Sequence, residues 1–170
     1  MKILLIGSQG SGKSTQAKLL SEYLNLPVIS TGDIFRKQAS FNEMIRTVLQ
    51  EGKLVDDMTT SKVVEERLNE SDCQNGFIMD GYPRNIHQKE LFDPGFDKVI
   101  YLKVPNEELV KRLMARGRED DTPESIQTRL NLYYQQTQPL LDYYKQKSIL
   151  VKVDGMGNIQ KVQDEIKKHL

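Results

Sequence analysis

The sequence predicts an α/β fold, in which a doubly wound sheet of five parallel strands is flanked by helices. Three observations lead to this fold class: short apolar runs recur along the chain, helical hydrophobic periods fill the intervals between them, and the first run ends in a glycine-rich turn. Continuous apolar runs are typical of strands buried on both faces of a parallel sheet. Because strand–helix–strand crossovers are right-handed, they place helices on both faces of that sheet.

The core strands are expected where the apolar runs lie. These runs are residues 3–6, 28–29, 77–79, 99–102 and 149–153. Helices are expected at residues 13–24, 34–50 with a break near Ser40, 59–68, 85–91, 107–115, 123–144 and 159–169. The chain of 170 residues has the length of one domain, large enough to fold without a disulfide scaffold.

Two stretches do not belong to a minimal core of this kind. Residues 30–55 are helical and lie between two strands, and residues 116–123 are charged and loop-like. Both are expected to be mobile flaps over a site.

Composition restricts the classes of protein to be considered. The 24 basic side chains equal the 24 acidic ones, and zero net charge argues against a surface built to bind nucleic acid. The single cysteine, Cys73, excludes an intrachain disulfide and a cysteine-rich zinc site. Only four apolar residues precede Gly7, too few for a signal sequence or a membrane span. We therefore expect a soluble, cytoplasmic protein without a membrane partner.

The strongest chemical signal is a phosphate-binding loop directly after the first predicted strand. Residues 7–14 match the pattern G-x-x-x-x-G-K-[ST], and a predicted helix follows. Glycines allow backbone N–H groups and the helix N-terminus to face an anion. Lys13 would supply a charge to the β- and γ-phosphates, and Ser14 a hydroxyl to Mg²⁺. In a turn that only joins strand to helix, these two side chains would serve no packing purpose.

Other segments narrow the class of nucleotide enzyme. The chain lacks the N-K-x-D motif with which GTPases read guanine. Asp80 follows the third apolar run, and a carboxylate at that strand end is well placed to hold the Mg²⁺ shell through water. Arg84 follows four residues later, so the two charges are expected to bracket a phosphoryl group.

The chain resembles the adenylate kinase family of nucleoside monophosphate kinases from Lys2 to its carboxyl end. The resemblance rests on Ser30-Thr31-Gly32-Asp33 with Arg36, Gly52-Lys53-Leu54-Val55, Asp80-Gly81-Tyr82-Pro83-Arg84 with Gln88, and Arg129-Leu130 with Tyr133, Tyr134 and Pro139. It implies reversible phosphoryl transfer from ATP to AMP, which gives two ADP and requires Mg²⁺. We expect a monomer in which residues 30–55 form the monophosphate-binding insertion and residues 116–123 form a lid.

The resemblance also implies roles for individual positions. For ATP, it implies contacts from Gly10, Ser11, Gly12, Lys13, Ser14, Thr15, Arg112 and Gly157. For AMP, it implies contacts from Thr31, Arg36, Lys53, Leu54, Val55, Gly81, Arg84, Gln88, Arg118 and Arg129. Phosphoryl transfer depends on alignment and on stabilising the charge of the transferred group. The catalytic roles accordingly fall to Lys13, Arg84, Arg116, Arg118 and Arg129.

The lid is the main departure from the family pattern. It runs from Arg116 to Asp121 straight between two predicted helices, and it lacks the four ligands that a zinc-bearing lid needs. Its acidic residues 119–121 are expected to lie on the outer side or to pair with basic residues. Arg112 and Arg116 share a helix face, where like charges repel, so we expect a polyanion between them.

Two other functions stay open at this point. The first is a UMP/CMP kinase, although Thr31 and Gln88 favour AMP, since relatives that take pyrimidines tend to carry Ala and Asn at these places. The second is a non-catalytic nucleotide-binding regulatory module. Such a module would be expected to lose Lys13, Arg84 or the lid arginines, and all of them are present.

Overall fold

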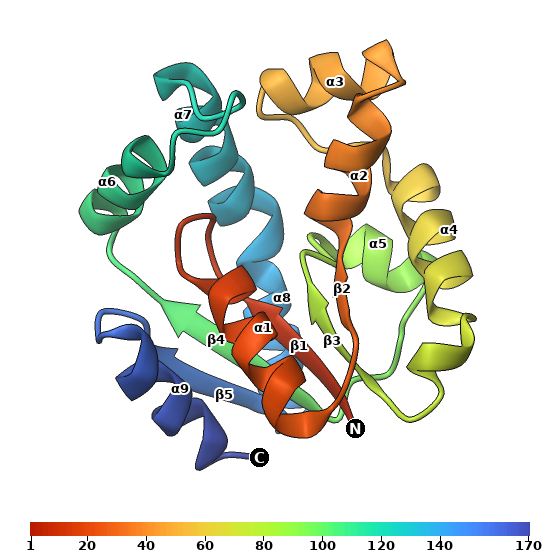
Figure 1. Cartoon of the computed structure of the whole chain (residues 1–170), viewed down its shortest axis with the longest axis vertical. Coiled ribbons are helices and arrows are strands. Elements are labelled where there is room, and N and C mark those ends of the chain that lie inside the picture. The colour runs from red at the N-terminus through yellow and green to blue at the C-terminus, as the bar shows by residue number, and fades with distance from the viewer.

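Five parallel strands form one sheet at the centre of the computed structural model, which describes all 170 residues (Figure 1). The strands are β1 (Lys2–Ile6), β2 (Val28–Ser30), β3 (Phe77–Asp80), β4 (Lys98–Lys103) and β5 (Leu150–Asp154). Their spatial order is β2-β3-β1-β4-β5, and every neighbouring pair is parallel. The predicted fold class and the number of strands are confirmed.

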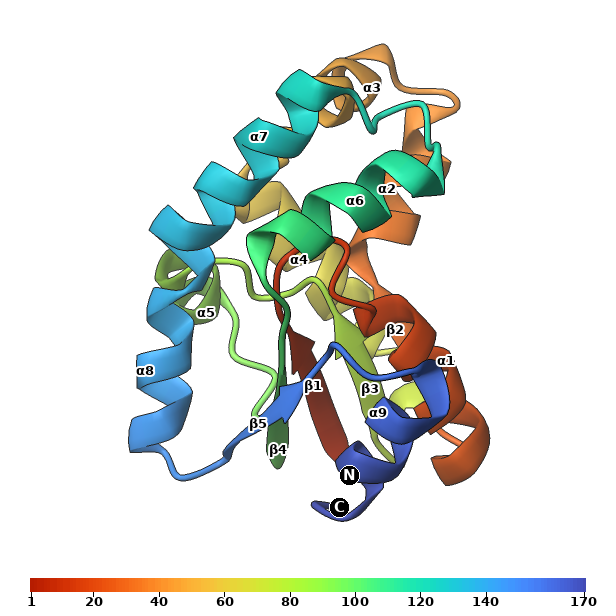
Figure 2. The same ribbon diagram turned by 90° about the vertical axis from the view of Figure 1, so that its left-hand side faces the viewer.

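Nine α-helices surround the sheet (Figure 2). They are α1 (Lys13–Leu24), α2 (Thr31–Ala39), α3 (Glu43–Gln50), α4 (Asp57–Leu68), α5 (Ile86–Leu91), α6 (Asn106–Arg116), α7 (Pro123–Leu132), α8 (Pro139–Gln146) and α9 (Ile159–Lys167). Two short segments have other helical geometries: a 3₁₀ turn, η1 (Ser71–Cys73), and a π-helical segment, η2 (Tyr133–Thr137).

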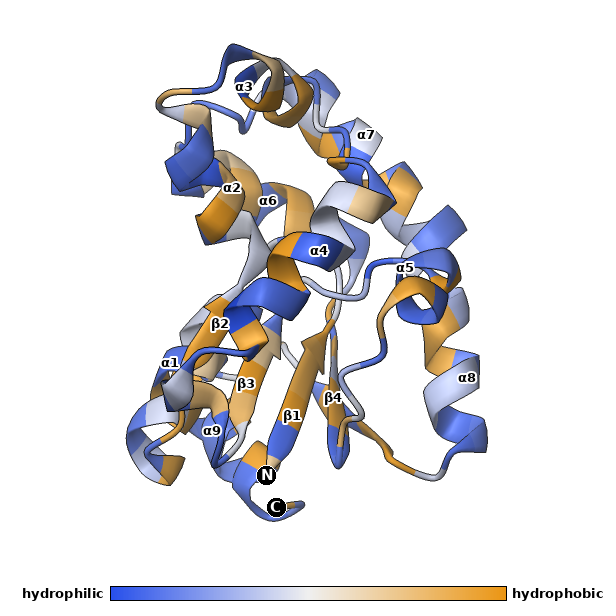
Figure 3. Ribbon diagram, turned by 90° about the vertical axis from the view of Figure 1, so that its right-hand side faces the viewer, coloured by the Kyte–Doolittle hydropathy of each residue, from blue (hydrophilic) through white to orange (hydrophobic).

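Separate hydrophobic cores cover the two faces of the sheet. The strands are largely hydrophobic (Figure 3), and the side chains of β1 alternate between the faces. Leu4 and Ile6 pack on one face with side chains of α4 and α8, including Val64, Leu140 and Tyr144. Ile3 and Leu5 pack on the other face with side chains of α1 and α9, including Ala17, Leu20, Val162 and Ile166. Because β1 is buried on both sides, the loop that follows it starts from a rigid position.

A third, smaller core joins α6 to α7. It consists of Val104, Leu109, Leu113, Ile126 and Leu130. In Figure 1 these two helices stand on one side above the sheet, and α2 and α3 stand on the other side. The two stretches predicted to be flaps therefore lie at the same end of the molecule, beyond the carboxyl ends of the strands.

The first helix of residues 30–55 begins earlier than predicted. The Ser30 side chain accepts a hydrogen bond from the backbone N–H of Asp33 at 3.2 Å, which caps a helix that starts at Thr31 rather than at residue 34. The predicted break near Ser40 is confirmed, since α3 starts only after a second cap at Asn42.

The prediction of one helix over residues 123–144 is wrong in its middle. Pro139 has no backbone N–H, and its ring obstructs an α-helical turn before it. The chain forms a wider π turn instead, in which the Gln138 N–H donates to the Tyr133 carbonyl at 2.9 Å. Consequently α7 and α8 follow one another as a bent rod (Figure 2).

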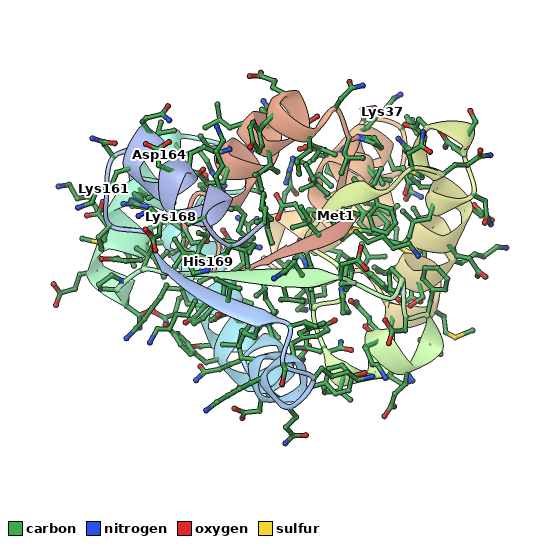
Figure 4. All side chains as sticks on the ribbon, turned by 90° about the horizontal axis from the view of Figure 1, so that it is seen from below. Met1, Lys37, Lys161, Asp164, Lys168 and His169 are labelled. Atoms are coloured by element: carbon green, nitrogen blue, oxygen red, sulfur yellow. The ribbon has the colours of Figure 1, made fainter.

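The end of the molecule opposite the flaps carries a solvated helix face. Lys161 and Asp164 of α9 are exposed, as is Lys168 directly after it, and Figure 4 labels the three residues in the view from below. The structure contains no helix with the combined length and apolar character that a membrane span requires.

Candidate active site

A cavity of about 960 Å³ lies at the carboxyl ends of the strands, the usual position of a ligand site in an open α/β sheet. Segments that follow β1, β2, β3 and β5 line it, together with α6 and α7. Every residue to which the resemblance assigned ATP, AMP or Mg²⁺ lies on the wall of this one cavity.

The phosphate loop curls around the amino group of Lys13. Its Nζ donates to the backbone carbonyls of Gly7 and Ser8 at 2.8 and 2.9 Å. Gly12 has a φ of +95° and turns the chain into α1, a left-handed conformation that glycine adopts without steric cost. The start of α1 has no side-chain cap, so its first N–H groups are available to an anion.

Lys13 lies in a cluster of positive charge. Burial lowers the pKa of Lys13 to about 8. The carboxylate of Asp80 raises this pKa, whereas the guanidinium groups of Arg84 and Arg116 lower it further. A polyanion bound among these groups would stabilise the charged lysine and raise its pKa again.

Ser14 and Asp80, each expected to hold Mg²⁺, lie side by side. The Ser14 hydroxyl donates to Asp80 Oδ2 at 2.6 Å. The register of the sheet explains the contact, because Asp80 at the end of β3 is opposite Leu5 of β1, close to the phosphate loop. A hydroxyl and a carboxylate are hard oxygen ligands of the kind that Mg²⁺ prefers, so the pair fits the predicted ion chemically.

Several polar atoms around the phosphate loop have no partner in the protein. Gln9 Oε1, Ser11 Oγ and Gln16 Oε1 are buried and unpaired, and their residues line the cavity. Buried polar atoms are almost always hydrogen-bonded in folded proteins. These atoms therefore indicate a polar ligand.

The insertion forms the opposite wall of the cavity. The Thr31 hydroxyl donates to the Gly81 carbonyl at 2.9 Å and thereby ties the start of α2 to the end of β3. Arg36 lies further along α2 and pairs with Asp33 at 2.5 Å. Residues 53–55, which follow α3, complete this wall.

Arg84 is held at three points between the two walls. Its Nε donates to the Gly81 carbonyl at 3.0 Å, and its backbone N–H donates to Gln88 Oε1 at 2.8 Å. Its backbone carbonyl accepts a hydrogen bond of 2.7 Å from the hydroxyl of Thr137. The π-helical segment η2 thus helps to fix the position of Arg84.

Two residues of this network were not predicted from the sequence. Thr137 holds Arg84, and Asp57 Oδ1 accepts a hydrogen bond from Gln88 Nε2 at 2.8 Å. They lie 53 and 31 residues from their partners, and no motif connects them. The sequence marks Asp57 only by its place at the start of a helix. Asp56, directly before it, caps α4 by accepting a hydrogen bond from the N–H of Thr59.

Two arginines, Arg116 of the lid and Arg129 of α7, are paired with carboxylates of the lid. Asp121 binds Arg116 through both oxygens, at 2.8 and 2.6 Å, and Arg129 at 3.0 Å. Asp120 also pairs with Arg129. The expectation that these acidic residues pair with basic ones is confirmed. Arg129 further donates to the Leu49 carbonyl at 3.2 Å, which joins the lid side of the cavity to the insertion.

Arg112 and Arg116, between which a polyanion is expected, each have a carboxylate partner within the chain. Arg112 Nε donates to Glu108 Oε1 at 2.8 Å, and Arg116 has its own carboxylate partner in Asp121. The repulsion between the two arginines is therefore compensated within the chain. Arg112 also donates to the Gly155 carbonyl at 3.1 Å, in the turn after β5.

Arg118 is the lid arginine without a carboxylate partner. Its side chain makes no ion pair in the protein, and the residue lines the cavity. Burial lowers the pKa of Arg118, and the charges of Arg36 and Arg116 lower it further. Guanidinium groups from both walls thus face the same space.

The comparisons with known proteins identify the family. The family model described as adenylate kinase matches residues 5–149. The chain belongs to the adenylate kinase family. Its membership confirms the enzyme class predicted from the residues, a nucleotide phosphotransferase.

Curated adenylate kinases match the chain over nearly its whole length. The protein from Bifidobacterium longum is 42% identical over 185 residues, which covers 100% of both chains. The protein from Nocardia farcinica is 40% identical over 175 residues, or 96% of each chain. The protein from Clostridium perfringens is 36% identical over 212 residues, which covers 100% of this chain and 98% of the relative. Because this chain has 170 residues, the Clostridium adenylate kinase carries segments that have no counterpart in it.

None of these adenylate kinases favours the two alternative functions, a UMP/CMP kinase or a non-catalytic module. The structure contains no group of three or more His, Cys, Asp or Glu side chains arranged to hold a metal ion.

Proposed function

We propose that the chain transfers the γ-phosphoryl group of ATP to AMP and gives two ADP, reversibly and with Mg²⁺. The observation that carries this proposal is the single cavity in which the phosphate loop faces the insertion, with Lys13, Arg84 and Arg118 between them. A cavity with cationic groups on both walls suits two phosphate-bearing substrates placed end to end.

The donor side would hold ATP. The phosphate loop from Gly10 to Thr15 offers N–H groups and the Lys13 amino group to its phosphates. Two hydrogen bonds to backbone carbonyls place the Lys13 amino group at this loop. Arg112 and Gly157 lie on the wall next to the turn after β5, where the base of ATP would lie.

The acceptor side would hold AMP. Arg36 would bind its α-phosphate with a forked pair of donors, and Thr31 and Gly81 would line the nucleotide with residues 53–55. Gln88 is buried on the same wall, and its amide would read the base.

The arginines would align and stabilise the group in transfer. Phosphoryl transfer needs little covalent help, and one well-placed arginine can contribute about 10³ to 10⁵ in rate. Arg84, Arg116, Arg118 and Arg129 lie on the cavity wall and can spread their donors over the oxygens of that group. Arg84 and Arg129 would act on both nucleotides.

Ser14 and Asp80 would hold the Mg²⁺ that accompanies ATP, either directly or through water. The ion would neutralise charge on the phosphate oxygens. The contact of 2.6 Å between the two side chains supports this assignment.

Residues 30–55 and 116–123 would be the moving parts of a single kinase domain. The hydrogen bond from Arg129 to the Leu49 carbonyl supports a closed arrangement in which the two sides touch. Every residue assigned to the two nucleotides lies on the cavity wall of this chain, so a monomer would be sufficient for the reaction. One cysteine requires no oxidising compartment, in agreement with a cytoplasmic location.

A coupled assay with MgATP and AMP, CMP, UMP or GMP as acceptor tests the proposal. We expect kcat/KM for AMP to exceed that for CMP or UMP by at least about tenfold, since a buried amide rejects bases that leave it unpaired. A higher kcat/KM for CMP or UMP would overturn the adenylate assignment, and hydrolysis of ATP without transfer would overturn the kinase.

A further inference from the structure

The Gln88 side chain is hydrogen-bonded at both ends of its amide. It is 1% exposed and lines the cavity. Its Oε1 accepts from the backbone N–H of Arg84 at 2.8 Å, and its Nε2 donates to Asp57 Oδ1 at 2.8 Å. Each end has one further bonding capacity, because an amide oxygen has two lone pairs and an amide nitrogen has two hydrogens. That spare donor and spare acceptor are available to a ligand in the cavity.

The direction of this amide is fixed by its partners. A backbone N–H can only donate and a carboxylate can only accept, so the oxygen of Gln88 must face Arg84 and its nitrogen must face Asp57. Burial raises the pKa of Asp57, but hydrogen bonds from Asn85, His87 and Gln88 outweigh burial and leave the pKa below its ordinary value. Asp57 is therefore an acceptor at neutral pH.

The same polarity extends through Asn85. Its Oδ1 accepts from the backbone N–H of Gln88 at 2.7 Å, which directs its Nδ2 to Asp57 Oδ1 at 3.0 Å. Two short chains of hydrogen bonds thus start at the backbone N–H groups of Gln88 and Arg84, and both end at Asp57 Oδ1. Asp57, where the two meet, lies on α4 rather than on α5.

The direction of the amide decides which purine it can pair with. Adenine presents an amino donor at C6 beside an acceptor at N1, whereas hypoxanthine, a base of the same shape, presents a carbonyl acceptor beside an N1–H donor. One amide can pair with either base only if it can rotate by half a turn. When its nitrogen is fixed toward Asp57 and its oxygen toward Arg84, the Gln88 amide can pair with only one of these two bases.

We propose that Asp57 is a specificity-determining positioning residue, which fixes the direction of the Gln88 amide so that the acceptor site takes 6-aminopurine and rejects 6-oxopurine monophosphates. This inference rests on the proposed function, in which Gln88 reads the acceptor base. Asp57 does not touch the base. Together with the backbone N–H of Arg84, it removes the alternative orientation of the group that does.

The experiment compares kcat/KM for AMP and for IMP, with MgATP as donor, in the wild type and in variants at this network. In Asp57→Ala the amide loses its obligatory acceptor. We expect the AMP:IMP ratio to fall by at least about tenfold, with the AMP effect mainly in KM and with kcat/KM for IMP equal to or above the wild-type value. Loss of the wall's shape alone would lower kcat/KM for both nucleotides.

Two variants serve as matched controls. Asp57→Asn keeps an oxygen that the Asn85 amide holds in place, so its AMP:IMP ratio should stay within about threefold of wild type. Asp56→Ala removes the neighbouring carboxylate, which caps α4 and does not contact Gln88, and should leave the ratio unchanged. If Asp57→Ala does not fold, Asp57→Ser replaces it, because a hydroxyl can donate or accept and should also reduce the ratio.

The outcomes separate this inference from the proposed function. If Gln88→Ala leaves the AMP:IMP ratio at its wild-type value, Gln88 does not read the base, and the acceptor-site assignment fails together with the inference. If Gln88→Ala abolishes the preference but Asp57→Ala lowers AMP and IMP equally, the acceptor site stands and the role of Asp57 is refuted. A fall in the ratio in Asp56→Ala as large as that in Asp57→Ala would also refute it.

Discussion

Arg116 binds both carboxylate oxygens of Asp121, from Nε to Oδ2 at 2.8 Å and from Nη2 to Oδ1 at 2.6 Å. The Asp121 side chain is fully buried, and its Oδ1 also accepts from Arg129 at 3.0 Å. One carboxylate therefore holds two of the proposed catalytic guanidinium groups beside each other. A lid this short has little area with which to cover a nucleotide, and such pairing orders its arginines before a substrate arrives.

Asp121 should make the stability of the protein depend on acidic pH. Burial raises its pKa, but the hydrogen bond and charge of Arg116, the N–H of Arg118 and the charge of Arg129 outweigh burial, so the folded-state pKa lies below the ordinary value. A depressed pKa stabilises the fold above the unfolded pKa of about 3.9, and this contribution is lost as the pH falls through the folded-state pKa.

Urea unfolding of the wild type and Asp121→Asn at a series of pH values measures this effect. We expect the wild type to be more stable by about 1 to 3 kcal/mol near neutral pH, with a difference that stays constant down to about pH 5 and shrinks below about pH 4. A difference that persists unchanged at about pH 2 would show that the charge of Asp121 is not the cause.

Lys13 should be essential for turnover and dispensable for folding. Its amino group donates to the Gly7 and Ser8 carbonyls of the phosphate loop. In Lys13→Met, kcat should fall at least about 100-fold while Tm stays near the wild-type value, because a preorganised charge is lost from the site. Lys18→Met, at an exposed position of the same helix, is the matched control. Near-normal turnover in Lys13→Met would refute the role of the phosphate loop.

Gly52 should be needed for closure of the insertion on α7. A Cβ at Gly52 would lie 2.6 Å from the Ser125 carbonyl oxygen, whereas a Cβ at Gly95 would meet nothing within 4 Å. Their φ angles are nearly the same, +72° and +69°, so an alanine at either position bears a similar backbone cost of about 1 to 2 kcal/mol.

The comparison of Gly52→Ala with Gly95→Ala separates the two effects. Both variants should lose a few degrees of Tm, by about the same amount. Only Gly52→Ala should raise KM for AMP, at least about threefold, because its methyl group prevents the insertion from reaching α7. Equal values of KM for AMP in the two variants would show that the enzyme does not need the contact between Gly52 and α7 to bind AMP.

The lid arginines should contact the phosphates of a bound bisubstrate analogue, two adenosines joined by a chain of phosphates. In a crystal structure of that complex, we expect guanidinium nitrogens of Arg116, Arg118 and Arg129 at about 2.7 to 3.2 Å from phosphate oxygens. Arg118 has no carboxylate to leave, and Glu119 should stay on the outside. If Arg116 and Arg129 both point to solvent in that complex, these arginines do not stabilise the transferred phosphate, and their proposed catalytic role is wrong.

The parts of the site that depend on local pattern could be predicted from the sequence. The apolar run before Gly7 and the spacing of Gly12 and Lys13 determine a strand, a loop and a helix that are neighbours in the chain. The contact between Ser14 and Asp80 could also be predicted, because parallel strands end at the same edge of the sheet.

Contacts between distant segments without a motif could not be predicted. Asp57 reaches Gln88 from another helix, and Thr137 reaches Arg84 from a π turn. That turn depends on Pro139, whose missing N–H outweighs a continuous helical pattern over residues 123–144. The start of α2 was misplaced for a similar reason, since the Ser30 cap is stronger than the apolar period that begins at Ile34.

The most direct test of phosphoryl transfer between two adenine nucleotides is ³¹P NMR of the purified protein with ADP and Mg²⁺ as its only substrates. The proposed function predicts that the ADP resonances decline while those of ATP and AMP grow in equal amounts, with no inorganic phosphate, and that Lys13→Met slows this change at least about 100-fold. Unchanged ADP resonances, or inorganic phosphate without ATP, would contradict it.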